Sequence, residues 1–182
     1  AQRWLHLSDA DGQALLDRLK EFVGRGGLAI GICNGFQLLV KLGLLPALDG
    51  KYFERQVSLG HNDSARYEDR WVTLKVNPAS PCVFTRGIDT LYVPVRHGEG
   101  KFIPRDNAAL ERLKKNGQVV FRYCNADGSA ADGKFPINPN GAIEDIAGIC
   151  DPSGRIFGLM PHPEANIDRT NHPCWTRLDL PE

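Results

Sequence analysis

The chain has 182 residues, 42% of them hydrophobic, with 22 basic and 22 acidic side chains. This length suits one domain with a sizeable core, and the balanced charge gives no electrostatic reason to expect nucleic acid or a membrane surface as a partner. No apolar stretch approaches the roughly 20 residues that span a bilayer, and no secretory signal opens the sequence. Five cysteines without a Cys-x-x-Cys pair are interpreted as reduced thiols, so we expect a cytoplasmic protein.

The first part of the chain predicts helix, strand, tight turn and helix. Ser8 or Asp9 can cap a helix whose apolar residues recur at helical spacing, and Gly24 suits the end of that helix. Residues 28–32 are short, apolar and bounded by glycine, which predicts a buried parallel strand. A second helix is expected over residues 34–43. This order is half of a doubly wound α/β pattern.

The rest of the chain is richer in strands. Strands are predicted at 71–76, 91–95 and 119–123, and a hairpin is predicted from 143–150 and 156–160. A capped helix is expected over residues 107–115. The long polar segments 49–69 and 125–141 predict loops of the kind that are usually functional or mobile.

We therefore predict an α/β fold with a doubly wound, mostly parallel sheet flanked by helices and an antiparallel hairpin region. Residues 1–182 are expected to form a single domain. A doubly wound sheet normally begins with a strand, whereas here a helix comes first, and residues 176–182 follow without a closing element. We expect the domain to be incomplete at both ends, lacking an N-terminal strand and a C-terminal helix.

A cysteine lies where the short apolar strand meets the second helix, in the segment Gly31-Ile-Cys-Asn-Gly35. This is the cysteine version of the Gly-x-Ser-x-Gly nucleophile elbow, in which a strand turns abruptly into a helix and exposes the nucleophile. The helix N-terminus is expected to lower the pKa of Cys33. The backbone N–H of Asn34 would point to where an oxyanion forms. The alternative is a core cysteine beside glycines, and the strand–helix context favours the nucleophile.

The chain contains five histidines, of which His162 stands out because it follows an apolar strand and lies between two prolines. Pro163 favours an extended backbone at His162. In an extended segment, residues two apart share a face, so Glu164 can hold the imidazole in one tautomer. The result is a predicted Cys33–His162–Glu164 triad. Taken alone, a loop histidine with an incidental glutamate is the simpler alternative.

Seven short words of the sequence resemble those of the class I (triad-type) glutamine amidotransferases, in the same order. Within that family they resemble the glutaminases that serve the synthesis of phosphoribosylformylglycinamidine. The words are Gly31-Ile-Cys-Asn-Gly-Phe-Gln37, Gly43-Leu-Leu-Pro46, Arg70-Trp-Val72, His97-Gly-Glu-Gly100, Asn138-Pro-Asn-Gly141, Ile146-Ala-Gly-Ile149 and Met160-Pro-His-Pro-Glu164. The resemblance covers nearly the whole chain and implies the flavodoxin-like fold of this family.

The resemblance also implies the reaction. Cys33 would attack the side-chain amide of glutamine, His162 would protonate the leaving ammonia, and water would release glutamate from the thioester. The ammonia would reach a partner synthetase subunit or domain that makes phosphoribosylformylglycinamidine in purine biosynthesis, with a third small subunit as an open alternative. ATP and magnesium would bind that partner, so no cofactor and no metal are expected in this chain.

Further residues at family positions are expected to contact glutamine. Gln37 lies at the substrate-contacting glutamine position, and the backbone of His97, Gly98 and Glu99 would hold the α-amino and α-carboxylate ends. The family's Pro-Gly-Gly loop, which supplies a second oxyanion donor, has no counterpart here.

Two other functions stay open at this point. One is a different cysteine hydrolase on the same elbow, and the other is a non-catalytic module that keeps the fold to bind its partner. The Met-Pro-His-Pro-Glu word disfavours the first, because other elbow hydrolases usually take their acid from a separate strand. The intact triad disfavours the second.

Overall fold

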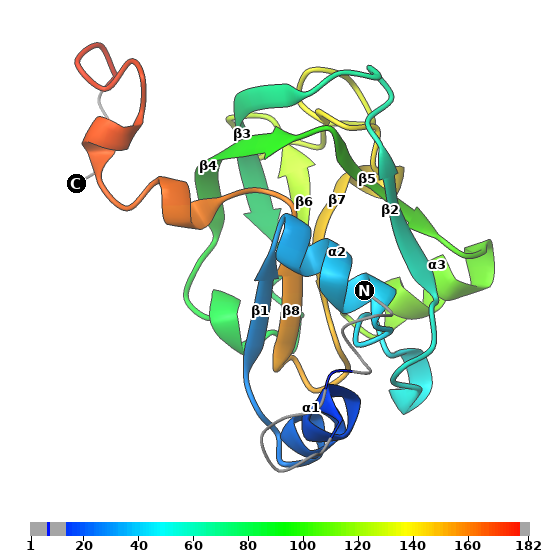
Figure 1. Ribbon diagram of the computed structural model, residues 1–182. Helices are drawn as coiled ribbons and strands as arrows, with labels where there is room; N and C mark the ends of the chain where they lie inside the picture. The colour runs from blue at the N-terminus through cyan, green and yellow to red at the C-terminus, as the bar shows by residue number, and fades with distance from the viewer. Residues whose placement is uncertain (1–6, 8–13, 179–182) are drawn as a thin grey trace.

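The computed structural model describes residue 7 and residues 14–178 (Figure 1). The helices are α1 (Leu15–Gly24), α2 (Asn34–Lys41) and α3 (Asn107–Lys115). The strands are β1 (Ala29–Ile32), β2 (Val57–His61), β3 (Glu68–Val76), β4 (Thr90–His97), β5 (Glu99–Pro104), β6 (Val119–Cys124), β7 (Ile146–Cys150) and β8 (Ile156–Leu159). The predicted α/β class is confirmed.

The described strands form a six-stranded sheet in the order β1-β8-β7-β6-β3-β4 and a two-stranded ribbon of β2 with β5. Only the β1–β8 pair is parallel, and the other pairs of the main sheet are antiparallel. The expectation of a mostly parallel sheet was therefore wrong for these strands. Parallel neighbours need a long crossover, usually a helix, whereas β7 and β8 are joined by a tight turn at residues 151–154. That turn confirms the predicted hairpin.

Helix α2 lies across β1 and β8 (Figure 1). Its buried residues Phe36 and Val40 face the sheet. A Cβ atom at Gly158 on β8 would lie 2.1 Å from the Phe36 ring, so only glycine allows the helix to approach this closely. The close approach fixes the direction in which α2 leaves β1, and with it the position of the residue between them.

Strand β1 is less buried than predicted. It is an edge strand of the described sheet, with β8 as its neighbour. Gly31 is buried beneath α2, whereas Ile30, which points to the opposite face, is 49% exposed. A short apolar run does not distinguish a strand that is covered on both faces from one that is covered on a single face.

The two long polar segments differ from each other in structure. Residues 49–69 contain β2, which pairs antiparallel with β5, and neither strand was predicted. Residues 125–141 contain no regular helix or strand and are held by side-chain hydrogen bonds. Among these, Asn138 donates to the carbonyl of Ala142 at 2.9 Å. Backbone hydrogen bonds, such as that from the Asn138 N–H to the Lys134 carbonyl at 2.9 Å, also hold this second segment.

The start of α3 agrees with its predicted cap, whereas the end of α1 differs from the prediction. Helix α3 begins as predicted, and the Asp106 carboxylate accepts a 2.7 Å hydrogen bond from the Ala109 N–H. Ser8 and Asp9, the predicted caps of α1, lie outside the described residues. Helix α1 ends at Gly24, but the residue with the left-handed backbone that favours glycine is Gly26, with φ 72°.

Candidate active site

Cys33 occupies the junction between β1 and α2 with φ 51° and ψ −104°. Positive φ is costly for a residue with a side chain and is typical of nucleophile elbows. The surrounding structure holds it on both sides: its N–H donates to the Leu159 carbonyl at 2.8 Å, and its carbonyl accepts from the Gln37 N–H at 3.0 Å. Cys33 is thus both the end of the strand ladder and the start of the helix. The predicted elbow geometry is present.

The two glycines of the elbow differ in importance. A Cβ at Gly31 would lie 2.7 Å from the backbone of Gly35, which leaves no room for any side chain at residue 31. A Cβ at Gly35 would meet no described atom within 4 Å. The sequence motif suggests that both glycines relieve crowding, but in the described structure only Gly31 does.

The thiol of Cys33 is less acidic than the sequence predicted. Burial raises its pKa, and the negative charge of Glu164 raises it further. A hydrogen bond from the Asn34 N–H at the start of α2 opposes this rise but does not overcome it. The expected lowering of the pKa was therefore wrong, because the loss of water on burial outweighs the hydrogen bond from the Asn34 N–H. The sulfur of Cys33 lies 3.9 Å from the Arg96 carbonyl oxygen.

His162 and Glu164 make the predicted contact, but the backbone conformation of this segment differs from the predicted one. Nδ1 of His162 lies 2.6 Å from the Glu164 carboxylate. Glu164 belongs to the short 3-10 turn Pro163–Ala165 rather than to an extended segment, and the His162 N–H donates to the Pro94 carbonyl of β4 at 2.8 Å. Because Nδ1 donates to the carboxylate, Nε2 of the neutral ring carries the lone pair. This Nε2 is buried and has no hydrogen-bond partner among the described residues.

Cys33 and His162 lie at the same edge of the sheet because they follow two parallel neighbouring strands. Ile32 on β1 pairs with Leu159 on β8, so both chains leave the sheet at its carboxyl edge (Figure 1). Ligands of α/β proteins typically bind outside this edge.

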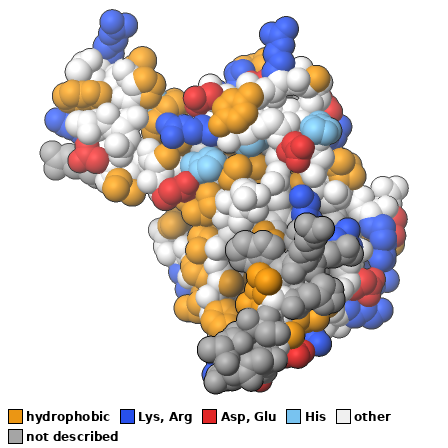
Figure 2. Space-filling view, in the orientation of Figure 1, with side chains coloured by type: hydrophobic (Ala, Val, Ile, Leu, Met, Phe, Trp, Pro, Cys, Tyr) orange, Lys and Arg blue, Asp and Glu red, His pale blue; other side chains and the backbone are white. Residues whose placement is uncertain are grey.

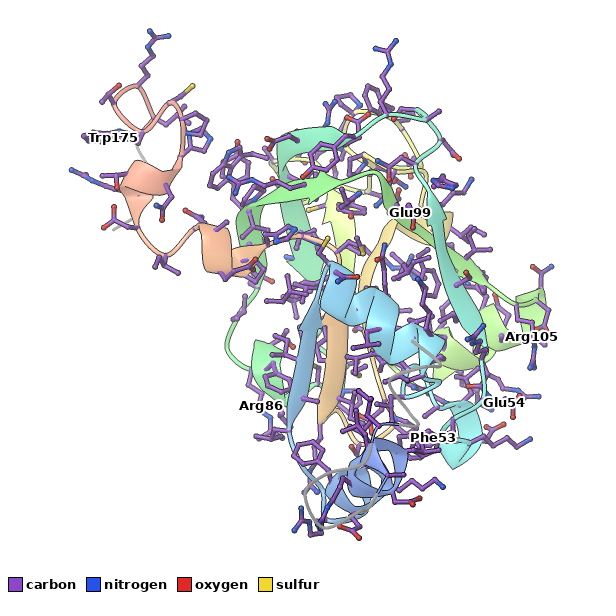
Figure 3. The ribbon with its side chains drawn as sticks, viewed as in Figure 1. Phe53, Glu54, Arg86, Glu99, Arg105 and Trp175 are labelled. Atoms are coloured by element: carbon purple, nitrogen blue, oxygen red, sulfur yellow. The ribbon has the colours of Figure 1, made fainter. Side chains whose placement is uncertain are left out.

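Gln37 and the segment between β4 and β5 form one wall beside the cysteine. The Gln37 side-chain amide donates to the Glu99 carbonyl at 2.8 Å. The Gly98 carbonyl accepts from the Asn62 N–H at 3.0 Å, which fixes the backbone of this segment. The Glu99 side chain, labelled in Figure 3, is 49% exposed and lies 3.6 Å from His61. The structure thus brings together the predicted substrate-contacting residues Gln37, Gly98 and Glu99.

The His97 side chain is buried behind this wall. It is 3% exposed, and Nδ1 lies 3.2 Å from the Asn62 side-chain oxygen. Burial, aided by the positive charge that His162 would carry, lowers the pKa of His97 to about 4. Sequence reasoning assigned this residue a main-chain role, and it overlooked Asn62 and Tyr123, which line the same buried region. The only sequence signal was Asn138-Pro-Asn-Gly141, which places Asn140 beside Tyr123.

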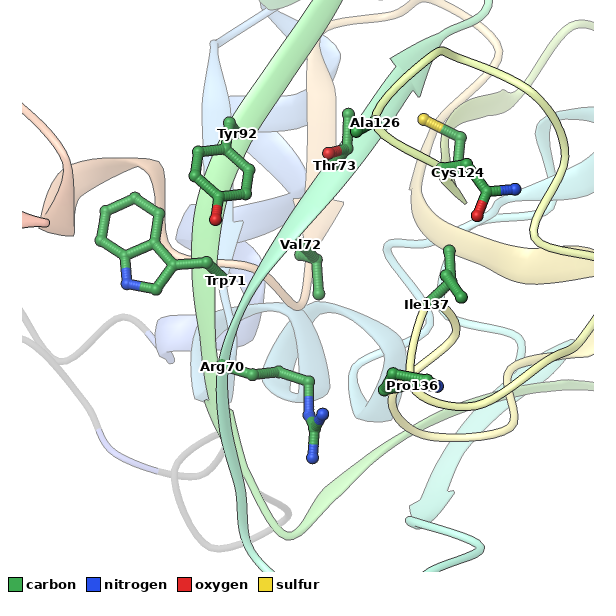
Figure 4. A pocket seen from close by; sticks show the side chains of 10 residues that line it. Arg70, Trp71, Val72, Thr73, Tyr92, Cys124, Ala126, Pro136 and Ile137 are labelled. Atoms are coloured by element: carbon green, nitrogen blue, oxygen red, sulfur yellow. The ribbon is translucent and has the colours of Figure 1, made fainter. Parts of the chain in front are cut away.

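Other features that can carry a function are a metal site, a membrane-spanning helix and a pocket. The part of the chain that the structure describes has no group of three His, Cys, Asp or Glu residues arranged to hold a metal ion. In the same part, no helix is both long and apolar enough to cross a membrane. A pocket of about 190 Å³ lies beside β3 and β4, with Trp71 and Tyr92 on one side and Pro136 and Ile137 on another (Figure 4). None of the candidate site residues lines it.

Comparison with known proteins shows which family this sequence resembles. A sequence profile of the CobB/CobQ-like glutamine amidotransferase domain matches residues 1–182. The chain is 52% identical over 159 residues to phosphoribosylformylglycinamidine synthase subunit PurQ of Methanococcus maripaludis, a match that covers 87% of this chain and 58% of that protein. It is 48% identical over 168 residues to PurQ of Dehalococcoides mccartyi, with 91% and 62% covered.

A solved structure is also similar. The structure of PurLQS from Thermotoga maritima matches with a TM-score of 0.63 at 29% identity, covering 87% of this chain and 61% of that one. This chain therefore spans only about three fifths of the length of the relatives that it matches.

Proposed function

Because this chain belongs to the family of CobB/CobQ-like glutamine amidotransferase domains, we propose that it hydrolyses glutamine to glutamate and ammonia through a cysteinyl thioester. The observation that carries the proposal is the elbow cysteine at the end of β1, beside a His162–Glu164 pair at the end of the parallel neighbour β8. A nucleophile, a base and a group that orients the base are the set required for acyl transfer.

The state of each group suggests the order of proton movement. Since burial keeps Cys33 protonated, its proton passes to Nε2 of His162 as the sulfur attacks the amide carbon. The imidazolium then gives this proton to the leaving nitrogen, so the C–N bond breaks and ammonia departs. Glu164 stabilises the transient charge through Nδ1. The Asn34 N–H at the start of α2 would stabilise the oxyanion.

We assign the recognition of glutamine to the wall beside the cysteine. The backbone of residues 97–99 would hold the charged α-amino and α-carboxylate ends of the substrate. Gln37 supports this wall through its hydrogen bond to the Glu99 carbonyl. The carbonyls of His97, Gly98 and Glu99 already accept hydrogen bonds from Asn62 and Gln37, which hold the backbone of this wall in place.

The relatives suggest where the ammonia goes. PurQ relatives are named as subunits of phosphoribosylformylglycinamidine synthase, and PurLQS is an assembly of T. maritima. On that basis, the ammonia is delivered to a synthetase partner that makes phosphoribosylformylglycinamidine in purine biosynthesis. ATP and magnesium bind that partner, and a third small subunit completes the assembly. The reaction takes place in the cytoplasm, where free thiols such as those of this chain stay reduced.

The test is Cys33→Ala in the full-length protein assembled with its synthetase partner. Ammonia release from glutamine is expected to fall to background, and glutamine-dependent synthesis is expected to stop. Synthesis supported by ammonium salts should continue, because it bypasses the glutaminase. An unchanged rate of glutamine hydrolysis in Cys33→Ala would refute the assignment. Wild-type protein that binds the partner but never hydrolyses glutamine would favour a non-catalytic module.

A further inference from the structure

The Glu164 carboxylate, which orients His162 in the proposed reaction, has few contacts of its own. Its side chain is 52% exposed, and Nδ1 of His162, at 2.6 Å, is its one hydrogen-bond partner among the described residues. Packing therefore does not fix this side chain. Its position depends on the backbone of the 3-10 turn Pro163–Ala165 that carries it.

Strand β4 presents a row of backbone carbonyls beside this turn. The strand lies at the end of the described sheet, so one of its edges has no neighbouring strand among the described residues. Along such an edge every second residue points its carbonyl outward, and on β4 these residues are Tyr92, Pro94 and Arg96. Proline fits the middle position, because a residue that faces the free edge has no ladder hydrogen bond to donate. The Arg96 carbonyl is the one that lies 3.9 Å from the Cys33 sulfur.

The turn that carries Glu164 is attached to this edge at both ends. The His162 N–H donates to the Pro94 carbonyl at 2.8 Å, and the Asn166 side-chain amide donates to the Tyr92 carbonyl at 2.8 Å. The turn consequently lies alongside β4 (Figure 1). Because both carbonyls belong to one strand, β4 sets the spacing between the two attachments, and Glu164 lies midway between them.

The turn has little internal support. The Ala165 N–H donates to the His162 carbonyl at 3.1 Å, and the Asn166 N–H donates to the Pro163 carbonyl at 3.1 Å. A single 3-10 turn has poor hydrogen-bond geometry and is seldom stable without outside contacts. Its conformation therefore depends on the two attachments to β4.

The C-terminal arm, residues 165–178, touches this part of the sheet again through His172. The ring of His172 lies 5.6 Å from that of Tyr92 and 4.4 Å from that of Trp71, measured between centroids. This contact is far along the arm from the triad, and Ile167, which lies before it, is 85% exposed. Among the described residues, the hydrogen bond of Asn166 is thus the attachment of the arm nearest to the triad.

We propose that Asn166 is a positioning residue for glutamine hydrolysis, which keeps Glu164 in contact with His162 by holding the arm to the Tyr92 carbonyl. This inference rests on the proposed glutaminase function. Asn166 touches neither the imidazole nor the sulfur in the described structure, so it acts through Glu164. A shift of about 1 Å in a catalytic group can cost about 10²-fold in rate, which is why a single anchor near the triad matters.

The test uses Asn166→Ala and Asn166→Asp in the full-length protein assembled with its partner. Aspartate has the shape of asparagine but no amide donor, so both variants lose the hydrogen bond to Tyr92. We expect kcat for glutamine to fall about tenfold and KM to change less than about twofold. The KM should hold because Asn62 and Gln37, rather than Asn166, support the wall that we assign to glutamine binding. Synthesis supported by ammonium salts should keep its wild-type rate, which shows that the assembly is folded.

A double variant separates positioning from a general effect on the fold. If Asn166 acts through the carboxylate, Asn166→Ala should slow Glu164→Gln by less than about twofold further, because the contact that it supports is already weakened. An effect on the fold alone would multiply the two losses.

Asn171→Ala is the matched control. This asparagine belongs to the same arm, and its side-chain oxygen accepts a 3.0 Å hydrogen bond from the Asp168 N–H rather than binding β4. Its kcat should stay within about twofold of wild type.

Three results would overturn the positioning role and leave the glutaminase function intact, provided that Cys33→Ala is inactive. They are a kcat within about twofold of wild type in Asn166→Ala or Asn166→Asp, an equal loss in Asn171→Ala, and a full tenfold loss on top of Glu164→Gln. A wild-type assembly that never hydrolyses glutamine would instead overturn the proposed function itself.

Discussion

At the scale of single residues, two opposing effects act on the cysteine. A helix N-terminus stabilises a nearby anion by typically 0.3–1 kcal/mol, and partial burial acts against the anion. In this site burial is the larger effect, and the carboxylate of Glu164 adds to it. For the proposed reaction, this predicts a proton transfer from Cys33 to His162 during attack rather than a thiolate at rest.

The substitution Glu164→Gln tests two effects of this carboxylate, one on His162 and one on the pKa of Cys33. Removing the carboxylate charge deprives the His162 imidazolium of its partner, so glutamine hydrolysis is expected to fall by roughly 10²-fold or more. The same change removes a charge that raises the Cys33 pKa, so alkylation of Cys33 should shift to lower pH. The measurements are the rate of ammonia release and the pH profile of iodoacetamide labelling at Cys33, followed by peptide mass spectrometry.

Glu164→Gln is thus expected to slow glutamine hydrolysis while it makes Cys33 more reactive toward iodoacetamide at a given pH. In wild type, labelling of Cys33 should rise only above the pH range of an ordinary thiol, because the raised pKa keeps the thiolate scarce at neutral pH. A wild-type labelling midpoint below that of a free cysteine, or a Glu164→Gln profile shifted upward, would contradict this account of the electrostatics.

At the scale of elements, the predictable features were those whose signals are local. Helix α3 was predicted because Asp106 is a cap and the residues after it have helical spacing. The ribbon of β2 and β5 was missed because its partners are far apart in sequence and its strands are partly polar. The direction of β3, β4 and β6 depends on which strands become neighbours, and no local pattern reports that.

The elbow between β1 and α2 gives a prediction about its two glycines. Gly31→Ala places a Cβ against the Gly35 backbone and Leu39, and it should destabilise the protein by about 1–3 kcal/mol. Gly35→Ala meets no described atom, lies within α2 and should leave the free energy of unfolding unchanged or raise it by up to about 1 kcal/mol. Urea unfolding of both variants against wild type measures the difference. Equal destabilisation by the two substitutions would contradict the assigned crowding.

At the scale of the whole molecule, the sequence predicted the triad and its family but not how the site is built around them. The motif words predicted a triad of Cys33, His162 and Glu164, and of its contacts the structure contains the 2.6 Å contact between His162 and Glu164. The protonation state of Cys33 and the buried role of the His97 side chain depend on solvent exclusion by distant segments, including residues 138–141. Such burial emerges only when the chain is folded.

The C-terminal segment, residues 165–178, forms an arm beside the candidate site. Trp175 lies in an arm that projects from the body of the protein (Figure 3), and the space-filling view shows a notch between this arm and the main body, with histidine, acidic and basic side chains around it (Figure 2). Trp175 is 39% exposed and lies against Arg169, while Ile167 earlier in the arm is 85% exposed. The arm leaves the body directly after the His162–Glu164 pair, so it borders the candidate site without contributing to the triad.

The central claim is that the sulfur of Cys33 attacks the glutamine side chain. The most direct measurement is covalent labelling of the full-length assembly with a diazo-ketone analogue of glutamine, followed by peptide mapping. The analogue should inactivate glutamine hydrolysis with one label per chain, located on Cys33, and excess glutamine should protect against it. A label on Cys82, Cys124, Cys150 or Cys174 instead, or full glutaminase activity in protein whose Cys33 is completely modified, would contradict the account.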